Sequence, residues 1–166
     1  GIFVNTPDEK INNFANFWLK HQVALCAEVG RDTGKGFRDQ LQDATNLCII
    51  DEELTKNQII TNAKHQFEQG DVLHWWHQII QMGLRSRYKD DFLWLVFAVN
   101  KYVTISGNYK FLDELVEFAS GQQLKEKEEE RGITYSYTEE KKSIFEHCLL
   151  SLEHSMENIG ENGLPL

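Results

Sequence analysis

Apolar residues recur along this chain mainly at intervals of three or four positions, the spacing that places side chains on one face of a helix. The first such row follows Thr6-Pro7-Asp8-Glu9, a capping box with proline at the first helical position. The row consists of Ile11, Phe14, Trp18 and Leu25. The pattern predicts a first helix over residues 7–29 that ends at Gly30.

The same periodicity predicts five more helices, at about residues 37–49, 51–70, 90–106, 111–119 and 138–160. The helix over residues 90–106 has apolar side chains around nearly its whole circumference, which indicates a central, buried helix. We therefore expect an all-α fold of about six helices, forming one domain over residues 1–166.

Two segments lack a helical period, and we expect both to be long loops. Residues 71–88 are rich in aromatic side chains, and residues 121–137 are polar and include the charged run 125–130, which is expected to be a solvated surface. Long loops on a rigid helical scaffold often carry the functional site.

The overall charge excludes two classes of partner. The net charge is −9 and the pI is about 5.1, which argues against binding to nucleic acid phosphates or to an anionic membrane surface. The longest apolar run, residues 92–99, is too short to span a bilayer, and no signal peptide is visible. Cys26, Cys48 and Cys148 show neither a disulfide framework nor metal spacing, so we expect free thiols in a reducing cytoplasm.

The first candidate for chemistry is the polar run from Arg38 to Asp43. On a helix, Asp39 and Asp43 lie one turn apart on the same face. Carboxylates accept hydrogen bonds from pairs of sugar hydroxyls and a guanidinium donates to them, so the run could face a binding cavity. Alternatively, Asp39 complements the helix N-terminus and the other side chains are exposed.

The second candidate is His74-Trp75-Trp76-His77. A pyranose ring has an apolar face of C–H bonds that packs on an aromatic plane, so the tryptophans could line a sugar site. The alternative is core packing with hydrogen-bonded imidazoles. The two histidines lack a third metal ligand nearby, so no metal site is expected.

The third candidate is the pair Asp90-Asp91, which follows Arg85 and Arg87 at the start of the predicted buried helix. The pair could form the rim of a site. Alternatively, Asp90 caps the helix and Asp91 complements its dipole.

Together these runs resemble glycoside hydrolase family 94, the inverting β-glycoside phosphorylases. The similarity is closest to cyclic β-1,2-glucan synthases, in their phosphorylase-like region, and to β-1,2-oligoglucan phosphorylases, and it extends over nearly the whole chain. The motifs occur in the order Gly36–Asp43, Gly70–Trp76, Arg85–Leu95, Phe145–Cys148 and Gly163–Leu166.

The resemblance implies an (α/α)6 toroid, of which this chain would form about half. It implies phosphorolysis of β-glucans or β-glucosides with inversion, in which inorganic phosphate is the co-substrate, no other cofactor is needed and α-glucose 1-phosphate is the product. It also implies that Arg38, Asp39 and Asp43 bind the transferred glucose. The residues implied to line the same mouth are Trp75, Trp76, Arg87, Asp90 and Asp91.

The chain departs from the family pattern at one point. The family's general acid lies in a Gly-Asp-Trp-Asn-Asp segment shortly after the Gly-Leu-Pro-Leu stretch, at which this sequence ends. We therefore expect no catalytic residue in this chain, no activity of the isolated chain, and association into homo-oligomers through exposed apolar helix faces. The alternatives are a non-catalytic carbohydrate-binding module and a helical interaction scaffold.

Overall fold

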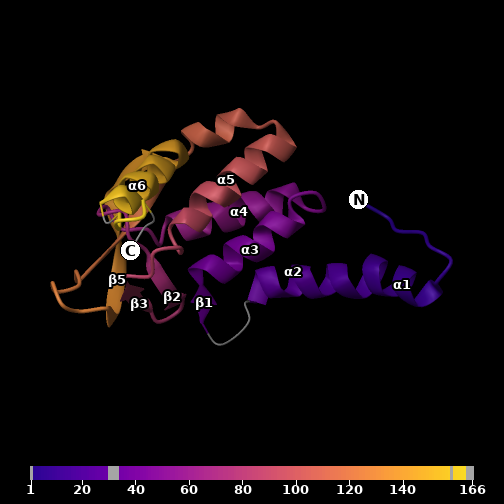
Figure 1. The fold of residues 1–166 in the computed structure, drawn as a ribbon, viewed down its shortest axis with the longest axis horizontal. Coiled ribbons are helices and arrows are strands. Elements are labelled where there is room, and N and C mark those ends of the chain that lie inside the picture. The colour runs from indigo at the N-terminus through magenta and orange to yellow at the C-terminus, as the bar shows by residue number, and fades with distance from the viewer. Residues whose placement is uncertain (1, 30–33, 158, 164–166) are drawn as a thin grey trace.

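The computed structural model describes residues 2–29, 34–157 and 159–163, with helices and strands interleaved along the chain (Figure 1). The helices are α1 Glu9–Asn13, a π-helical turn Phe14–Trp18, α2 Leu19–Val29, α3 Phe37–Leu47, α4 Glu52–Ala63, α5 Leu93–Ser106, a 3-10 turn Tyr109–Asp113 and α6 Ile144–Met156. The strands are β1 Lys35–Gly36, β2 Leu73–His77, β3 Met82–Ser86, β4 Leu115–Gly121 and β5 Glu130–Ser143. The expected helix stop at Gly30 and the last three residues of the Gly163–Leu166 motif lie outside the described residues.

The five strands form an antiparallel sheet in the order β1-β2-β3-β5-β4. The expectation of an all-α fold, and of a partial (α/α)6 toroid, is therefore wrong, and the chain is a mixed α/β structure. Helices α3, α4, α5 and α6 gather beside this sheet (Figure 1). β2, β3 and the first part of β5 occupy the segments that lacked a helical period, whereas most of β4 and the end of β5 lie where helices were expected.

The segment 71–88, expected to be a loop, contains a β-hairpin. β2 pairs with β3 from Leu73 opposite Arg85 to His77 opposite Met82, and the turn between them includes Gln81 at a φ of 48°. Aromatic side chains favour a pleated, half-buried surface. The aromatic content of this segment therefore favours a strand, and a search for helical spacing does not detect it because strands alternate with a period of two.

Two predicted helices in the C-terminal third are also corrected. Residues 111–119 form the end of the 3-10 turn and part of β4. Thr138 lies in β5, and the last helix instead begins after Ser143, which forms a capping box with Glu146. In β5, Ile133 and Tyr135 are both buried at strand spacing.

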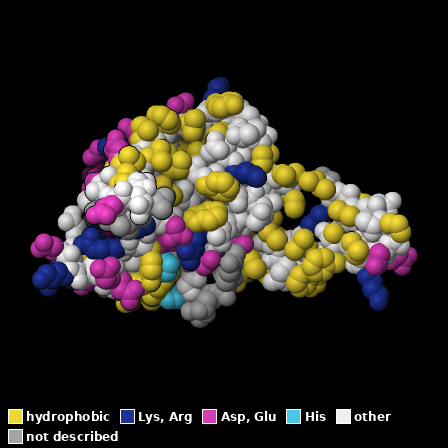
Figure 2. Space-filling model, viewed as in Figure 1, with side chains coloured by type: hydrophobic (Ala, Val, Ile, Leu, Met, Phe, Trp, Pro, Cys, Tyr) yellow, Lys and Arg dark blue, Asp and Glu magenta, His cyan; other side chains and the backbone are white. Residues whose placement is uncertain are grey.

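The first helix projects away from the rest of the chain (Figure 1). α1, the π-helical turn and α2 run on from one another, and Asp8, rather than Thr6, caps the start by accepting from the backbone N–H groups of Lys10 and Ile11. Most of its large apolar residues face solvent, and Figure 2 shows apolar side chains along the projecting helix. The exposed ones are Ile11, Phe14, Phe17, Trp18, Leu19, Leu25 and Val29.

The core joins the inner faces of the other helices to the sheet. α5 contributes Leu95, Ala98, Val99 and Tyr102, as expected of a central helix, but its Phe97 is exposed, so the helix is not buried all round. Other large members of the cluster are Phe37, Leu41, Ile59, Phe67, Trp76, Phe111 and Ile144.

Candidate functional site

Three elements that are distant in sequence meet at the candidate site: β2, the start of α3 and the start of α5. β1 places Gly36, the residue before α3, opposite Trp75 of β2. Arg38 Nη1 donates to Asp90 Oδ2 at 2.7 Å, and His74 Nδ1 lies 2.6 Å from Asp91 Oδ2. All three sequence candidates therefore contribute residues to one region.

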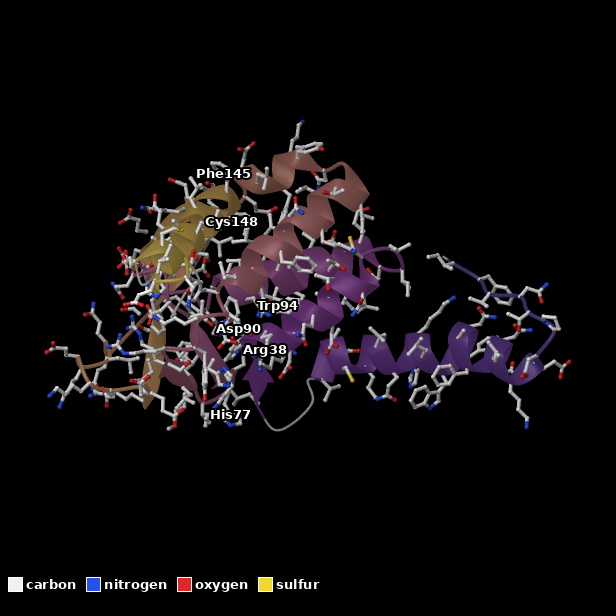
Figure 3. The ribbon with its side chains drawn as sticks, viewed as in Figure 1. Arg38, His77, Asp90, Trp94, Phe145 and Cys148 are labelled. Carbon is white, nitrogen blue, oxygen red and sulfur yellow. The ribbon has the colours of Figure 1, made fainter. Side chains whose placement is uncertain are left out.

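The Arg38–Asp90 ion pair ties α3 to the start of α5 (Figure 3). The hydrogen bond to Asp90 raises the pKa of Arg38, so the guanidinium remains charged. Both side chains are exposed by about half, so the pair adds little to stability. A guanidinium carries five N–H groups, and a pair at the surface can therefore also present donors and acceptors to a polar ligand.

His74 holds the neighbouring carboxylate. Asp91 is only 1% exposed, and its Oδ1 has no hydrogen-bond partner within the described ranges. The hydrogen bond to Asp91 raises the pKa of His74, because the protonated imidazole neutralises a carboxylate that is out of water. The His74 ring also lies 4.6 Å from the ring of Tyr88. Sequence reasoning did not assign His74 to the site, since its partner lies 17 positions away.

Asp39 and Asp43 occupy one side of α3, as their spacing predicts. Gly36 is the N-cap of α3 and has no side chain to cap with. The Asp39 carboxylate turns toward this helix start, with Oδ2 2.9 Å from the position that a Cβ on Gly36 would take. Asp39 thus complements the N-terminus of α3. Asp43 is buried one turn further along.

The two tryptophans differ in their surroundings. Trp76 is 0% exposed, and its ring stacks on His65 at 3.9 Å, so it matches the core-packing alternative. Trp75 is half-buried and makes an edge contact with His77 at 5.4 Å. Trp75 is therefore the tryptophan of β2 whose ring a ligand could reach.

Trp76 packs on a polar cluster formed by His65, Tyr135 and Tyr137. His65 Nδ1 lies 2.7 Å from the carbonyl oxygen of Thr61, and its Nε2 lies 3.2 Å from the hydroxyls of both Tyr135 and Tyr137. Burial lowers the pKa of His65 to about 4, so its ring is neutral at physiological pH. This uncharged cluster joins β2 of the β2–β3 hairpin to β5.

Arg87 points toward a different part of the surface. Its Nε donates to the carbonyl of Glu128 at 2.8 Å and its Nη2 to that of Lys125 at 3.0 Å. It lines a cavity that also includes Asp71 and Arg85, and these two form a bidentate pair at 2.6 and 2.7 Å. Of the predicted site residues, Arg87 and Trp76 are thus not brought to the Arg38–Asp90 pair.

Residues 2–29, 34–157 and 159–163 contain neither a candidate metal site nor a candidate membrane span. Nowhere in these ranges do three His, Cys, Asp or Glu side chains come together in a way that could hold a metal ion. None of the helices in the same ranges combines the length and the apolar character needed to cross a bilayer.

Comparison with known proteins gives a match to the family described as the Glycosyl hydrolase 94 superfamily, catalytic domain, over residues 1–166. The chain is 36% identical over 171 residues to the cyclic beta-(1,2)-glucan synthase NdvB of Rhizobium meliloti. It is 35% identical over 165 residues to the solabiose phosphorylase of Paenibacillus borealis. It is 24% identical over 195 residues to the N,N'-diacetylchitobiose phosphorylase of Vibrio proteolyticus.

These matches take in nearly all of the chain but a small part of each relative. They cover 99%, 99% and 97% of this chain, in the same order. They cover 6% of the synthase, 19% of the solabiose phosphorylase and 22% of the diacetylchitobiose phosphorylase. The comparison therefore relates this chain to one segment of each of these proteins.

Proposed function

The chain belongs to the glycosyl hydrolase 94 superfamily as part of its catalytic domain, and from this we propose that it forms part of the substrate site of a carbohydrate phosphorylase acting on β-glucosides. The observation that carries the proposal is the Arg38–Asp90 ion pair between the starts of α3 and α5, together with the backbone pairing of Trp75 with Gly36, two residues before Arg38. Sugars are recognised by such a combination of polar groups and an apolar face.

The proposed reaction is phosphorolysis. A phosphate oxygen forms a bond to the anomeric carbon, and the bond from that carbon to the leaving sugar's oxygen breaks. A general acid supplies the proton that the leaving oxygen takes up. One displacement inverts the anomeric centre, so a β-glucoside gives α-glucose 1-phosphate.

We assign binding and orienting roles to the residues of this chain. Arg38 donates to sugar hydroxyls, while Asp43 and Asp90 accept from them. Trp75 offers its ring to the apolar face of the sugar. Asp39 and Asp91 fix the helix starts from which these side chains project.

We propose further that the 166-residue chain alone does not catalyse the reaction. Asp90 and Asp91 are each engaged by a cation, so we assign neither of them the role of general acid. Incubation of the chain with β-1,2-glucan and phosphate should release no glucose 1-phosphate. Release of that product would contradict this part of the proposal.

Calorimetric titration with cellobiose and with sophorose, the β-1,4- and β-1,2-linked glucobioses, tests the binding role. Arg38→Lys keeps the charge but loses the planar fork, and we expect it to weaken binding about tenfold, as should Asp43→Asn. Arg131→Lys is the matched control, because Arg131 pairs with Glu128 at 2.7 Å elsewhere on the surface. Absence of binding to the unmodified chain, or unchanged affinity in both site variants, would overturn the proposal.

Two other expectations stand as proposals. All three cysteines are free thiols, which supports a reducing cytoplasmic setting. The exposed apolar side chains of the projecting helix support self-association, because contiguous apolar patches of this kind are uncommon on monomers (Figure 2).

A further inference from the structure

A row of side chains on one face of α5 continues from the Arg38–Asp90 pair. An open cavity of about 210 Å³ lies along this row. Its lining residues are Asp90, Leu93, Trp94 and Phe97. Asp90 lies just before α5, and the spacing of three, one and three positions places Leu93, Trp94 and Phe97 on the side of the helix start that continues from it. In Figure 3, Trp94 lies close to Asp90 and Arg38.

The aromatic part of this row is fixed in position. The ring centroids of Trp94 and Phe97 are 5.4 Å apart with an interplanar angle of 79°, an edge contact that restricts both rings. Trp94 is partly buried and packs on the core, whereas Phe97 is 50% exposed. The core thus holds Trp94 from one side and leaves part of its surface to the cavity.

The polar end of the row is fixed as well. Asp90 is held at 2.7 Å by Arg38, so its carboxylate has a defined direction relative to the rings. An apolar platform bounded at one end by an ion pair is complementary to a ligand with a C–H face and a hydroxyl edge. It is poorly suited to an anion, since Asp90 alone is charged among the described residues that line the cavity.

We propose that this cavity is a further carbohydrate subsite, in which one hexose unit of a β-linked glucan packs on Trp94 and Phe97 and donates a hydroxyl hydrogen bond to Asp90. The inference rests on the proposed function and extends it to a second sugar unit. The names of the relatives support an oligosaccharide ligand, since they refer to a β-1,2-glucan and to diacetylchitobiose. Trp94 and Phe97 then contribute to the preference for substrates longer than one sugar.

The four tryptophans of the chain supply the test, because their indole N–H signals can be followed one by one in a ¹H–¹⁵N spectrum. Trp94 reports on the proposed subsite and Trp75 on β2. Trp18 reports on non-specific stacking at the projecting helix, and the fully buried Trp76 reports on the integrity of the fold. With cellobiose or sophorose we expect a saturable shift of the Trp94 signal and no shift of the Trp18 signal. Glucose should shift the Trp94 signal only with a weaker apparent affinity than either disaccharide.

Variants separate this subsite from the site at Arg38. Phe97→Ala and Trp94→Phe should each weaken disaccharide binding about three- to tenfold, the range expected for loss of a ring contact. Phe145→Ala is the matched control, because Phe145 is 51% exposed on α6 (Figure 3). Because Phe97 is half exposed, loss of its ring should not prevent folding. An unchanged Trp76 signal confirms that both variants are folded.

The outcomes are distinguishable. Unchanged affinity in Phe97→Ala and Trp94→Phe, together with lost binding in Arg38→Lys, would overturn the subsite while the proposed function stands. A Trp94 shift no larger than that of Trp18 would also overturn it. Failure of the unmodified chain to bind any disaccharide would remove the proposed function and this inference together.

Discussion

The imidazole Nδ1 of His74 lies 2.6 Å from Oδ2 of Asp91, and this contact joins β2 to the start of α5. It matters for the site because Asp90, the next residue, is the partner of Arg38. The two ion pairs therefore hold one short segment from two sides. The protonation state of His74 determines the strength of the His74–Asp91 pair, because only the charged imidazole forms an ion pair with the carboxylate.

The first prediction follows from the raised pKa of His74. A histidine whose pKa is higher in the folded than in the unfolded chain contributes stability that is fully present below its ordinary value, near 6.5, and that is lost as the pH rises through the folded value. The groups that face His74 are Asp91 and Asp39, which favour the cation, and Arg38, which opposes it. The contribution of His74 to the free energy of unfolding should therefore fall as the pH rises above about 6.5, while the lowered pKa values of His65 and His147 make their own contributions rise with pH.

His74→Gln is the test of this prediction, because glutamine keeps a donor but cannot titrate. We expect its free energy of unfolding to be lower than that of the unmodified chain at pH 6, and the difference between the two chains to shrink toward pH 8. His74→Ala should cost about 3 kcal/mol at pH 6, because it leaves the buried Asp91 carboxylate unpaired. A His74→Gln variant with an unchanged pH dependence would show that another group is responsible.

The second prediction concerns the buried Arg85–Asp71 pair. Arg85 Nε and Nη2 donate to the two carboxylate oxygens, Nη2 also donates to Gln69, and the guanidinium lies 3.7 Å from the ring centre of Phe67. Arg85→Lys loses the fork and the stacking, and we expect it to lower the free energy of unfolding by about 3 kcal/mol. Urea denaturation measures this, with Arg131→Lys as the control that should change it by less than about 1 kcal/mol.

Much of the helical structure could be predicted from sequence, because helix spacing and caps are local signals. Asp51 caps α4 as expected, and the last predicted helix is found as α6, although its Phe145, Leu149 and Met156, expected on the buried face, are exposed. The sheet was not predicted, since strand pairing joins residues far apart in sequence, such as Gly83 and Ile133. A short strand like Leu73–His77 also has too few alternations to stand out.

The candidate site was predictable in part for the same reason. The sequence places Arg38, Asp39 and Asp43 on one helix, but it does not show that Arg38 meets Asp90 across 52 positions. The burial of Trp76 depends on its packing against His65. The direction of Arg87 depends on its hydrogen bonds to the backbone of Lys125 and Glu128. The resemblance to a family implied that these motifs share one site. The contacts between them could be identified only in the folded structure.

The third prediction concerns two glycines with different surroundings. Gly70 has a φ of 94°, and a Cβ added there would lie 2.6 Å from Cβ of His154 and 2.9 Å from the backbone oxygen of Leu150. Gly70→Ala should therefore lower the free energy of unfolding by at least about 2 kcal/mol, through both backbone strain and a clash with α6. A Cβ on Gly132 would meet nothing within 4 Å, so Gly132→Ala should have almost no effect. Equal losses in the two variants would contradict this explanation.

The fourth prediction tests self-association through the projecting helix. Phe17 and Trp18 are exposed in the π-helical turn, and their burial against a second copy would remove two large rings from water. Light scattering should give a mass above that of the 19.3 kDa monomer, and the double change Phe17→Glu with Trp18→Glu should return the monomer mass because each carboxylate opposes burial. Ile79→Glu is the control, since Ile79 is 98% exposed at the tip of the β-hairpin and its change adds a carboxylate elsewhere on the surface. A monomeric unmodified chain, or equal dissociation by Ile79→Glu, would rule out the projecting helix as the interface.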